Sequence, residues 1–151
     1  MTKTLANGDI VTIYKALNDA SSFMKNSAIK LPSGMMWSLR KNMKALSPIF
    51  ELISETEKEL FQECMKPEFL QEVTDDQGNK QQQIKQEFMQ EFVAAVNVKI
   101  SELSLQKNEV VLDAIQESDI EKFVTDYDGK ISMPELDALE FFIAPTEKED
   151  K

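Results

Sequence analysis

The acidic stretch Asp126–Glu135, with the sequence DYDGKISMPE, has the residue types of a calcium site. It reproduces the later part of an EF-hand loop, with acids at positions three and five, glycine at six and glutamate at twelve. Position one falls on Val124, which offers no side-chain oxygen to a hard cation, and no second loop accompanies it. A turn followed by a capped helix explains the same residues, so calcium binding by Asp126, Asp128 and Glu135 is the weaker interpretation.

A second candidate is a partner-binding surface around the only tryptophan. Trp37 ends a Met-Met-Trp tripeptide and is followed by three basic residues, Arg40, Lys41 and Lys44. At helical spacing Trp37, Lys41 and Lys44 share one face, which suits the anchoring of a partner protein or an acidic surface. The alternative is a core tryptophan whose neighbouring cations bridge to the chain's own glutamates. The candidate partner-binding residues are Met36, Trp37, Arg40, Lys41 and Lys44.

Catalytic chemistry is poorly supported by the composition. The absence of histidine removes the usual general base and the commonest metal ligand, and one cysteine is too few for structural zinc. No Gly-rich phosphate loop is present, and 27 Asp and Glu residues cannot be sorted into acid–base pairs without a pocket. We therefore expect a protein that is not an enzyme, with no catalytic residues, no cofactor and no metal ion.

The charge of the chain is uneven. The net charge is −10, yet residues 1–50 carry seven Lys and Arg against two Asp, whereas residues 51–151 carry ten Lys against 25 Asp and Glu. Phosphate binding needs surplus cations, so direct binding of nucleic acid is disfavoured. Solubility alone is the simplest explanation of the acidity. The acidic surface also suits a partner protein with a basic surface, or imitation of nucleic acid by an inhibitor of a host defence or nucleic-acid-binding protein.

The sequence also predicts the cellular compartment of the protein. No apolar stretch approaches the length of a membrane span, and residues 1–8 lack the apolar region of a secretory signal. The single Cys64 lies in an apolar helical context, which predicts a buried, inert thiol. A cytoplasmic protein with no membrane partner is the expectation.

Hydrophobic periodicity predicts three helices, over about residues 9–26, 34–65 and 81–103. Pro48 lies inside the second, and because the apolar stripe keeps its phase across it, we expect a kinked but continuous helix. A polar turn at about residues 74–80 joins the second helix to the third, which favours an antiparallel helical hairpin with the shorter N-terminal helix packed on it.

The pattern changes after residue 105. The β-branched segment 109–115 predicts a strand, which we expect to pair with Lys130 and Ile131. The serine-to-glutamate spacing of Ser118–Glu121 and Ser132–Glu135 predicts two capping boxes, each opening a short helix.

Together these elements predict a mainly α (α+β) fold: a long antiparallel helical hairpin, an N-terminal helix and a small C-terminal strand/helix element. The prediction is a single domain over 1–151, divided into a helical part (about 9–104), a small α/β part (about 108–143) and a charged tail (144–151).

A series of short motifs runs through the chain in a fixed order. It comprises Leu31-Pro32, Lys41 and Lys44 ahead of Pro48, Glu57-Lys58-Glu59, the turn Asp75–Asn79, Glu87-Phe88, Val110–Ile115, and Ile131-Ser132 with Leu136, Leu139 and Phe142. In this order, over about residues 13–143, the chain resembles a family of small proteins encoded by phages and prophages of Gram-positive bacteria, classified as a domain of unknown function. The resemblance implies a phage-derived, non-enzymatic protein in the bacterial cytoplasm and transfers no active-site residues.

The leading interpretation is a phage accessory protein that binds another phage or host protein, in assembly or in control of the host. A homo-oligomer is compatible with it. The alternative is the acidic inhibitor that imitates nucleic acid, and the calcium-binding module is the weakest of the three.

Overall fold

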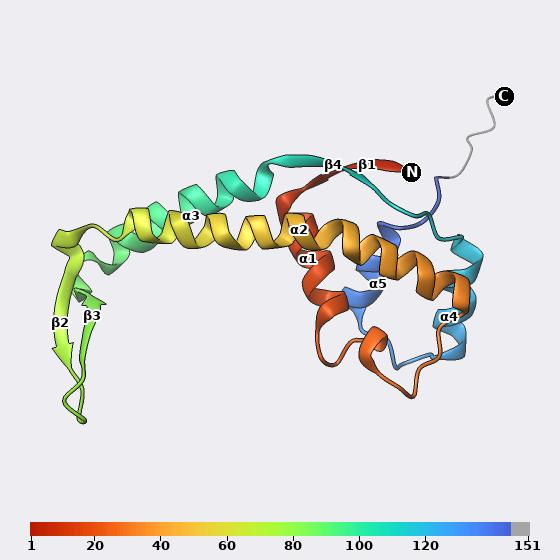
Figure 1. The fold of residues 1–151 in the computed structure, drawn as a ribbon, viewed down its shortest axis with the longest axis horizontal. Coiled ribbons are helices and arrows are strands. Elements are labelled where there is room, and N and C mark those ends of the chain that lie inside the picture. Colours follow the sequence, from red (N-terminus) through yellow and green to blue (C-terminus); the bar gives the residue numbers. More distant parts are fainter. Residues whose placement is uncertain (146–151) are drawn as a thin grey trace. The chain divides into compact units, whose positions relative to one another are not determined.

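The computed structural model describes residues 1–145 (Figure 1). Within them, helices hold more than half of the residues, and two small sheets of two strands each accompany the helices, so the protein is mainly α with minor β. The predicted charged tail lies outside the described residues from residue 146 onward. The elements are β1 (Thr2–Ala6), α1 (Asn7–Asn18), α2 (Ser33–Cys64), β2 (Leu70–Thr74), β3 (Lys80–Ile84), α3 (Met89–Leu105), β4 (Lys107–Val111), α4 (Glu117–Asp126) and α5 (Met133–Glu140).

The chain divides into two compact units. Of the described residues, unit 1 contains 1–50 and 107–145, and unit 2 contains 51–106, so the boundary falls within α2. This division concerns contacts, whereas the single-domain prediction concerns folding as one cooperative entity, which stays a prediction.

The sheet of unit 1 pairs the first strand with β4. These two strands are antiparallel, with Thr2 opposite Val111 and Ala6 opposite Lys107. The predicted pairing of the 109–115 segment with Lys130 and Ile131 is wrong. Strand β4 pairs with β1 in a two-stranded sheet, and Lys130 and Ile131 lie outside any strand, in the turn before α5.

The N-terminal helix is shorter than predicted. It ends at Asn18, where the chain turns to an extended conformation at Asp19. The Asp19 carboxylate accepts hydrogen bonds from the backbone N–H and the hydroxyl of Ser21, a local alternative to further helix. Residues Phe23–Lys25 form a separate 3₁₀ turn, and the buried Phe23 ring meets Phe123 at 5.2 Å between centroids.

The long helix α2 is continuous through Pro48, as predicted. In unit 1 it buries Met35, Leu39 and Leu46, whereas Met36 is exposed. The helix buries one polar side chain, Asn42, which is 1% exposed. Its amide donates to the Asp113 carbonyl at 2.9 Å and accepts from the Asp113 N–H at 2.6 Å, so the segment after β4 is held on α2 by both backbone groups of one residue.

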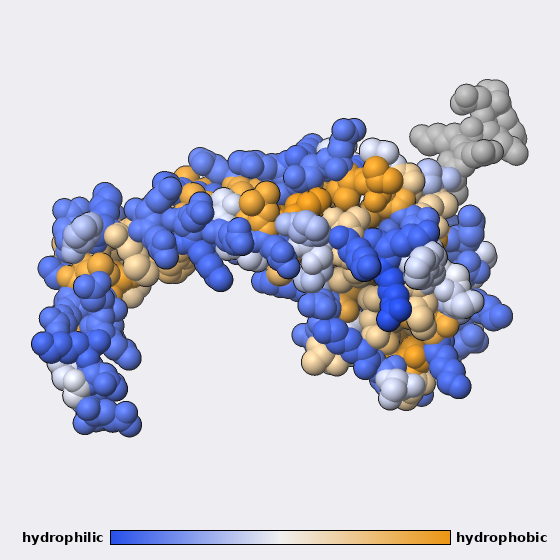
Figure 2. All heavy atoms as spheres, in the orientation of Figure 1, coloured by the Kyte–Doolittle hydropathy of each residue, from blue (hydrophilic) through white to orange (hydrophobic). Residues whose placement is uncertain are grey.

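Unit 2 contains a β-hairpin that the sequence did not predict. Strands β2 and β3 pair in register from Leu70–Ile84 to Thr74–Lys80. The turn is closed by the Asp75 carboxylate, which accepts from two backbone N–H groups, and by Gly78 at φ +82°, a conformation that favours glycine. The predicted start of the third helix at residue 81 is therefore wrong, and α3 begins at Met89. Figure 2 shows hydrophilic residues along this hairpin and apolar ones where it joins the helices.

The core of unit 2 is small. Cys64, Phe69, Phe92 and Val96 form its buried cluster, and Cys64 is buried as predicted. Between α2 and α3, Phe61 meets Phe92 edge to face at 5.1 Å between ring centroids. Few side chains therefore hold this unit together.

The two predicted capping boxes have opposite outcomes. Helix α4 begins at Glu117 after Gln116, with no side-chain cap, so the box at Ser118 is wrong. The box at α5 is confirmed, because the Ser132 hydroxyl accepts from the Glu135 N–H and the Glu135 carboxylate accepts from the Ser132 N–H.

We predict that Asn42→Ala destabilises unit 1. The substitution removes the side-chain amide that pairs with the carbonyl and the N–H of Asp113. A buried backbone group left without a hydrogen-bond partner lowers the free energy of unfolding by about 1–3 kcal/mol. Urea unfolding should show the loss, whereas Lys44→Ala on the exposed side of the same helix should change the free energy of unfolding by less than about 0.5 kcal/mol. Equal effects of the two substitutions would contradict the role given to Asn42.

Candidate protein-binding surfaces

The five residues predicted to bind a partner lie on the surface of α2 in unit 1, and we call them the Trp37 surface. Trp37 is 61% exposed, Met36 is 41% exposed, and Arg40, Lys41 and Lys44 are also exposed. The Lys41 ammonium lies 5.5 Å from the centroid of the Trp37 ring, a cation–π geometry. The alternative of a core tryptophan is therefore wrong.

The cations of the Trp37 surface are only partly neutralised by the chain itself. Lys41 lies 3.8 Å from the Asp113 carboxylate, with both side chains about half exposed, and such a surface pair contributes about 0–1 kcal/mol. Residues 33–50 contain no Asp or Glu. Within residues 1–145, Arg40 and Lys44 form no ion pair. The other part of that alternative, bridging of these cations to the chain's own glutamates, is also wrong within residues 1–145.

A second exposed surface lies on the helices of unit 2. Phe61 of α2, Met65 directly after its end, and Met89 and Val93 of α3 are each 37–44% exposed, and we call these four residues the hairpin face. In each segment they occupy the positions three before and one after a buried residue, Cys64 or Phe92, and so lie to the same rotational side of it. The Met65 N–H still donates to the Phe61 carbonyl at 3.2 Å, as it would in a helix.

The opposite side of the same helix pair is polar. There Glu63 and Lys99 form an ion pair at 3.2 Å. A small groove beside it is lined partly by Glu91 and Ala95. Glu63 and Glu91 are the residues directly before the buried Cys64 and Phe92. Since the residues before the buried positions lie together on this polar side, the residues after them lie together on the opposite side, which is the hairpin face.

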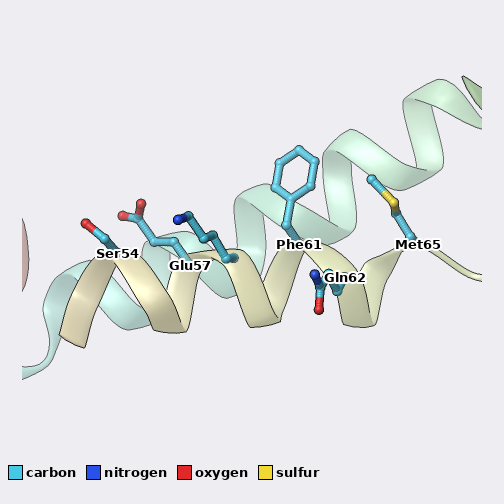
Figure 3. Close-up of a pocket in the computed structure, with 6 residues that line it drawn as sticks. Ser54, Glu57, Phe61, Gln62 and Met65 are labelled. Atoms are coloured by element: carbon cyan, nitrogen blue, oxygen red, sulfur yellow. The ribbon is translucent and has the colours of Figure 1, made fainter. Parts of the chain in front are cut away.

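A shallow groove of about 530 Å³ follows the α2 half of the hairpin face. Figure 3 shows Ser54, Glu57 and Phe61 projecting from α2 along it, with Met65 just past the end of the helix. Its lining residues are Ser54, Glu57, Lys58, Phe61, Gln62 and Met65.

Unit 2 exposes more large apolar side chains than it buries. In the described part of the chain, unit 1 buries 17 hydrophobic residues and exposes four large ones, whereas unit 2 buries six and exposes seven. Hydrophobic periodicity alone did not predict this surface. The missed signal was the width of the apolar stripe, which exceeds what one helix-to-helix contact can cover. The exposed set is Leu52, Phe61, Met65, Met89, Val93, Val98 and Leu105.

In the calcium-like motif, the glutamate carboxylate already accepts hydrogen bonds from the protein backbone. Asp126 and Asp128 are exposed, but Glu135 is buried and accepts from the backbone N–H groups of Ser132 at 3.1 Å and Phe23 at 3.3 Å. Among the residues described, no three or more His, Cys, Asp or Glu are grouped so that they could hold a metal ion.

An open groove of about 520 Å³ lies in unit 1. Its lining includes Lys15, Asp19, Ser21 and Glu135. The hydroxyl and then the backbone N–H of Ser21 lower the pKa of Asp19 below its ordinary value of 3.8. These hydrogen bonds belong to the turn after α1, so they have a structural explanation.

Comparison with known proteins places the chain in no group: no family model, no curated protein and no solved structure matches it. A search of the helices in the described region found none with the length and apolar character of a membrane span. The residues and their geometry therefore carry the functional argument.

We predict that Glu135→Ala lowers the stability of unit 1 by about 1–3 kcal/mol, since two N–H groups lose their acceptor. Millimolar calcium should leave the melting temperature of the native chain unchanged, as it should for a variant with Asp126→Asn and Asp128→Asn. A calcium-induced rise that the double substitution abolishes would restore the cation site.

The lowered pKa of Asp19 predicts a small, acid-sensitive contribution to stability. A carboxyl whose pKa is lower in the folded state stabilises the fold above its unfolded pKa, and the contribution is lost as the pH falls through the folded pKa. An NMR titration should place the Asp19 midpoint below 3.8, and Ser21→Ala should move it upward. An unchanged midpoint in that variant would contradict the assigned cause.

Proposed function

We propose that this chain is a non-enzymatic accessory protein that binds another protein through the Trp37 surface. The observation that carries the proposal is a tryptophan 61% exposed on a regular helix. Tryptophan is enriched among residues that dominate binding energy, because its large ring buries much apolar area with few rotatable bonds. A helix also holds the ring in place before binding, which reduces the ordering cost of association.

The surroundings of Trp37 favour a partner surface that is apolar at its centre and acidic at its rim. Arg40 and Lys44 supply cations on the same side of α2, and Lys41 keeps its ammonium near the indole. Opposite charges at a rim steer association and fix orientation more than they add affinity. The Trp37 surface is basic, whereas the whole chain has a net charge of −10. The charge that a partner meets at this surface is therefore opposite in sign to the net charge of the chain.

The resemblance to phage and prophage proteins supplies the biological setting of the proposal. An accessory protein of this kind acts in phage assembly or in control of the bacterial host, in the host cytoplasm. The lack of histidine and the exposed, open character of the grooves support a binding role over catalysis.

The alternative is an acidic inhibitor that occupies the nucleic-acid site of a host protein. The observation in its favour is a row of exposed carboxylates, Glu51, Glu55 and Glu59, at four-residue spacing on α2 in unit 2. Such a row would attract a basic partner, and its binding would weaken steeply with salt.

Affinity capture from infected host cells followed by measurement with the purified partner separates the two proposals. We predict that Trp37→Ala weakens binding at least tenfold, which corresponds to about 1.4 kcal/mol. Met133→Ala, which removes another exposed apolar side chain of unit 1, should leave affinity unchanged. The inhibitor proposal predicts the opposite result. If replacing Glu51, Glu55 and Glu59 by lysine abolished binding while Trp37→Ala left the affinity unchanged, the Trp37 proposal would be overturned.

A further inference from the structure

We propose that the hairpin face of unit 2 is an interface between two copies of this chain. The proposal is independent of the Trp37 surface, which belongs to unit 1. It starts from the imbalance of unit 2, where seven large apolar residues are exposed and six hydrophobic residues are buried. Two helices bury only the sides that face each other, so apolar residues on an adjacent side need another layer.

The geometry of the hairpin face suits a second helix pair. Phe61 contributes from α2, Met65 from the residue after its end, and Met89 and Val93 from α3. Both segments therefore present apolar side chains to the same side. Two such pairs placed face to face form a four-helix arrangement, in which each pair supplies the layer that the other lacks. The methionines adapt their shape to the opposing surface, which eases packing of identical faces.

The charges beside the face favour a second copy over a partner of one sign. Glu57 and Lys58 are adjacent in the lining of the groove, and the other polar lining residues, Ser54 and Gln62, are neutral. Neither charged residue forms an ion pair within residues 1–145. A twofold axis passing near them brings Glu57 of each copy to Lys58 of the other, because an isologous interface repeats every contact twice. A purely basic or purely acidic partner would leave one of these charges opposed.

The overall charge of unit 2 makes the salt dependence diagnostic. Residues 51–106 carry five Lys against 12 Asp and Glu, so two copies repel each other at long range. Added salt screens this repulsion, while the apolar contact is not weakened by it. The dissociation constant of the dimer should therefore fall as the salt concentration rises. Binding between partners of opposite net charge would show the reverse dependence.

Sedimentation of the full chain over a range of concentrations tests the interface. We expect a reversible dimer, and we expect Val93→Glu to raise its dissociation constant at least tenfold. Val98→Glu is the matched control, because Val98 lies on the same helix, is 60% exposed and is outside the hairpin face. Circular dichroism of both variants identifies any that fail to fold, and the salt series on the native chain tests the proposal without substitution.

A charge exchange tests the second copy as the occupant. Glu57→Lys and Lys58→Glu should each weaken self-association, since each places like charges across the axis. An equimolar mixture of the two variants should form mixed dimers at least as tightly as the native chain. A native chain that is monomeric at all concentrations and salt conditions, or equal effects of Val93→Glu and Val98→Glu, would overturn the proposal. Trp37→Ala should remain dimeric, so failure here is distinct from failure of the partner-binding proposal.

Discussion

Burial along one side of α2 is the constraint on which the rest of the structure depends. In unit 1 this helix meets α1, where the rings of Tyr14 and Phe50 stack with centroids 4.3 Å apart, and its one buried polar group, Asn42, satisfies both backbone groups of Asp113. In unit 2 the covering layer is thin, and the buried cluster has four members. The same amphipathic helix therefore has a well-covered apolar side in one unit and a partly covered one in the other. The apolar surface left over is where we expect contacts with other molecules.

The two proposed surfaces differ in the forces they use. The Trp37 surface combines one large aromatic ring with cations on a segment free of acids, so charge orients the partner and the ring supplies apolar contact. The hairpin face combines four apolar side chains with one acid and one base, so apolar burial drives association and the charges only set the register. A dimer that presents two Trp37 surfaces would gain avidity for a partner with repeated sites.

Sequence reasoning predicted the parts of the fold that local periodicity determines. The bounds of α2, the burial of Cys64 and the capping box at Ser132 follow from residue spacing alone. The pairing of β1 with β4 joins residues more than one hundred positions apart, and no local pattern encodes it. The strand Lys80–Ile84 contains three glutamines, which suit a helix, and its pairing with β2 overrides that preference. The sequence did not decide whether Trp37 is exposed, because helical periodicity is the same whether or not another element packs on that side of the helix.

Oxidative footprinting of the side chains, with and without the captured partner, tests the central claim most directly. Trp37 is the only tryptophan, so its oxidation can be followed without ambiguity, and Met133 is an exposed reference in the same unit. We expect the partner to protect Trp37 and Met36 from oxidation while Met133 reacts at its free rate. Equal oxidation of Trp37 in the free and bound protein would contradict the claim that this surface makes the contact.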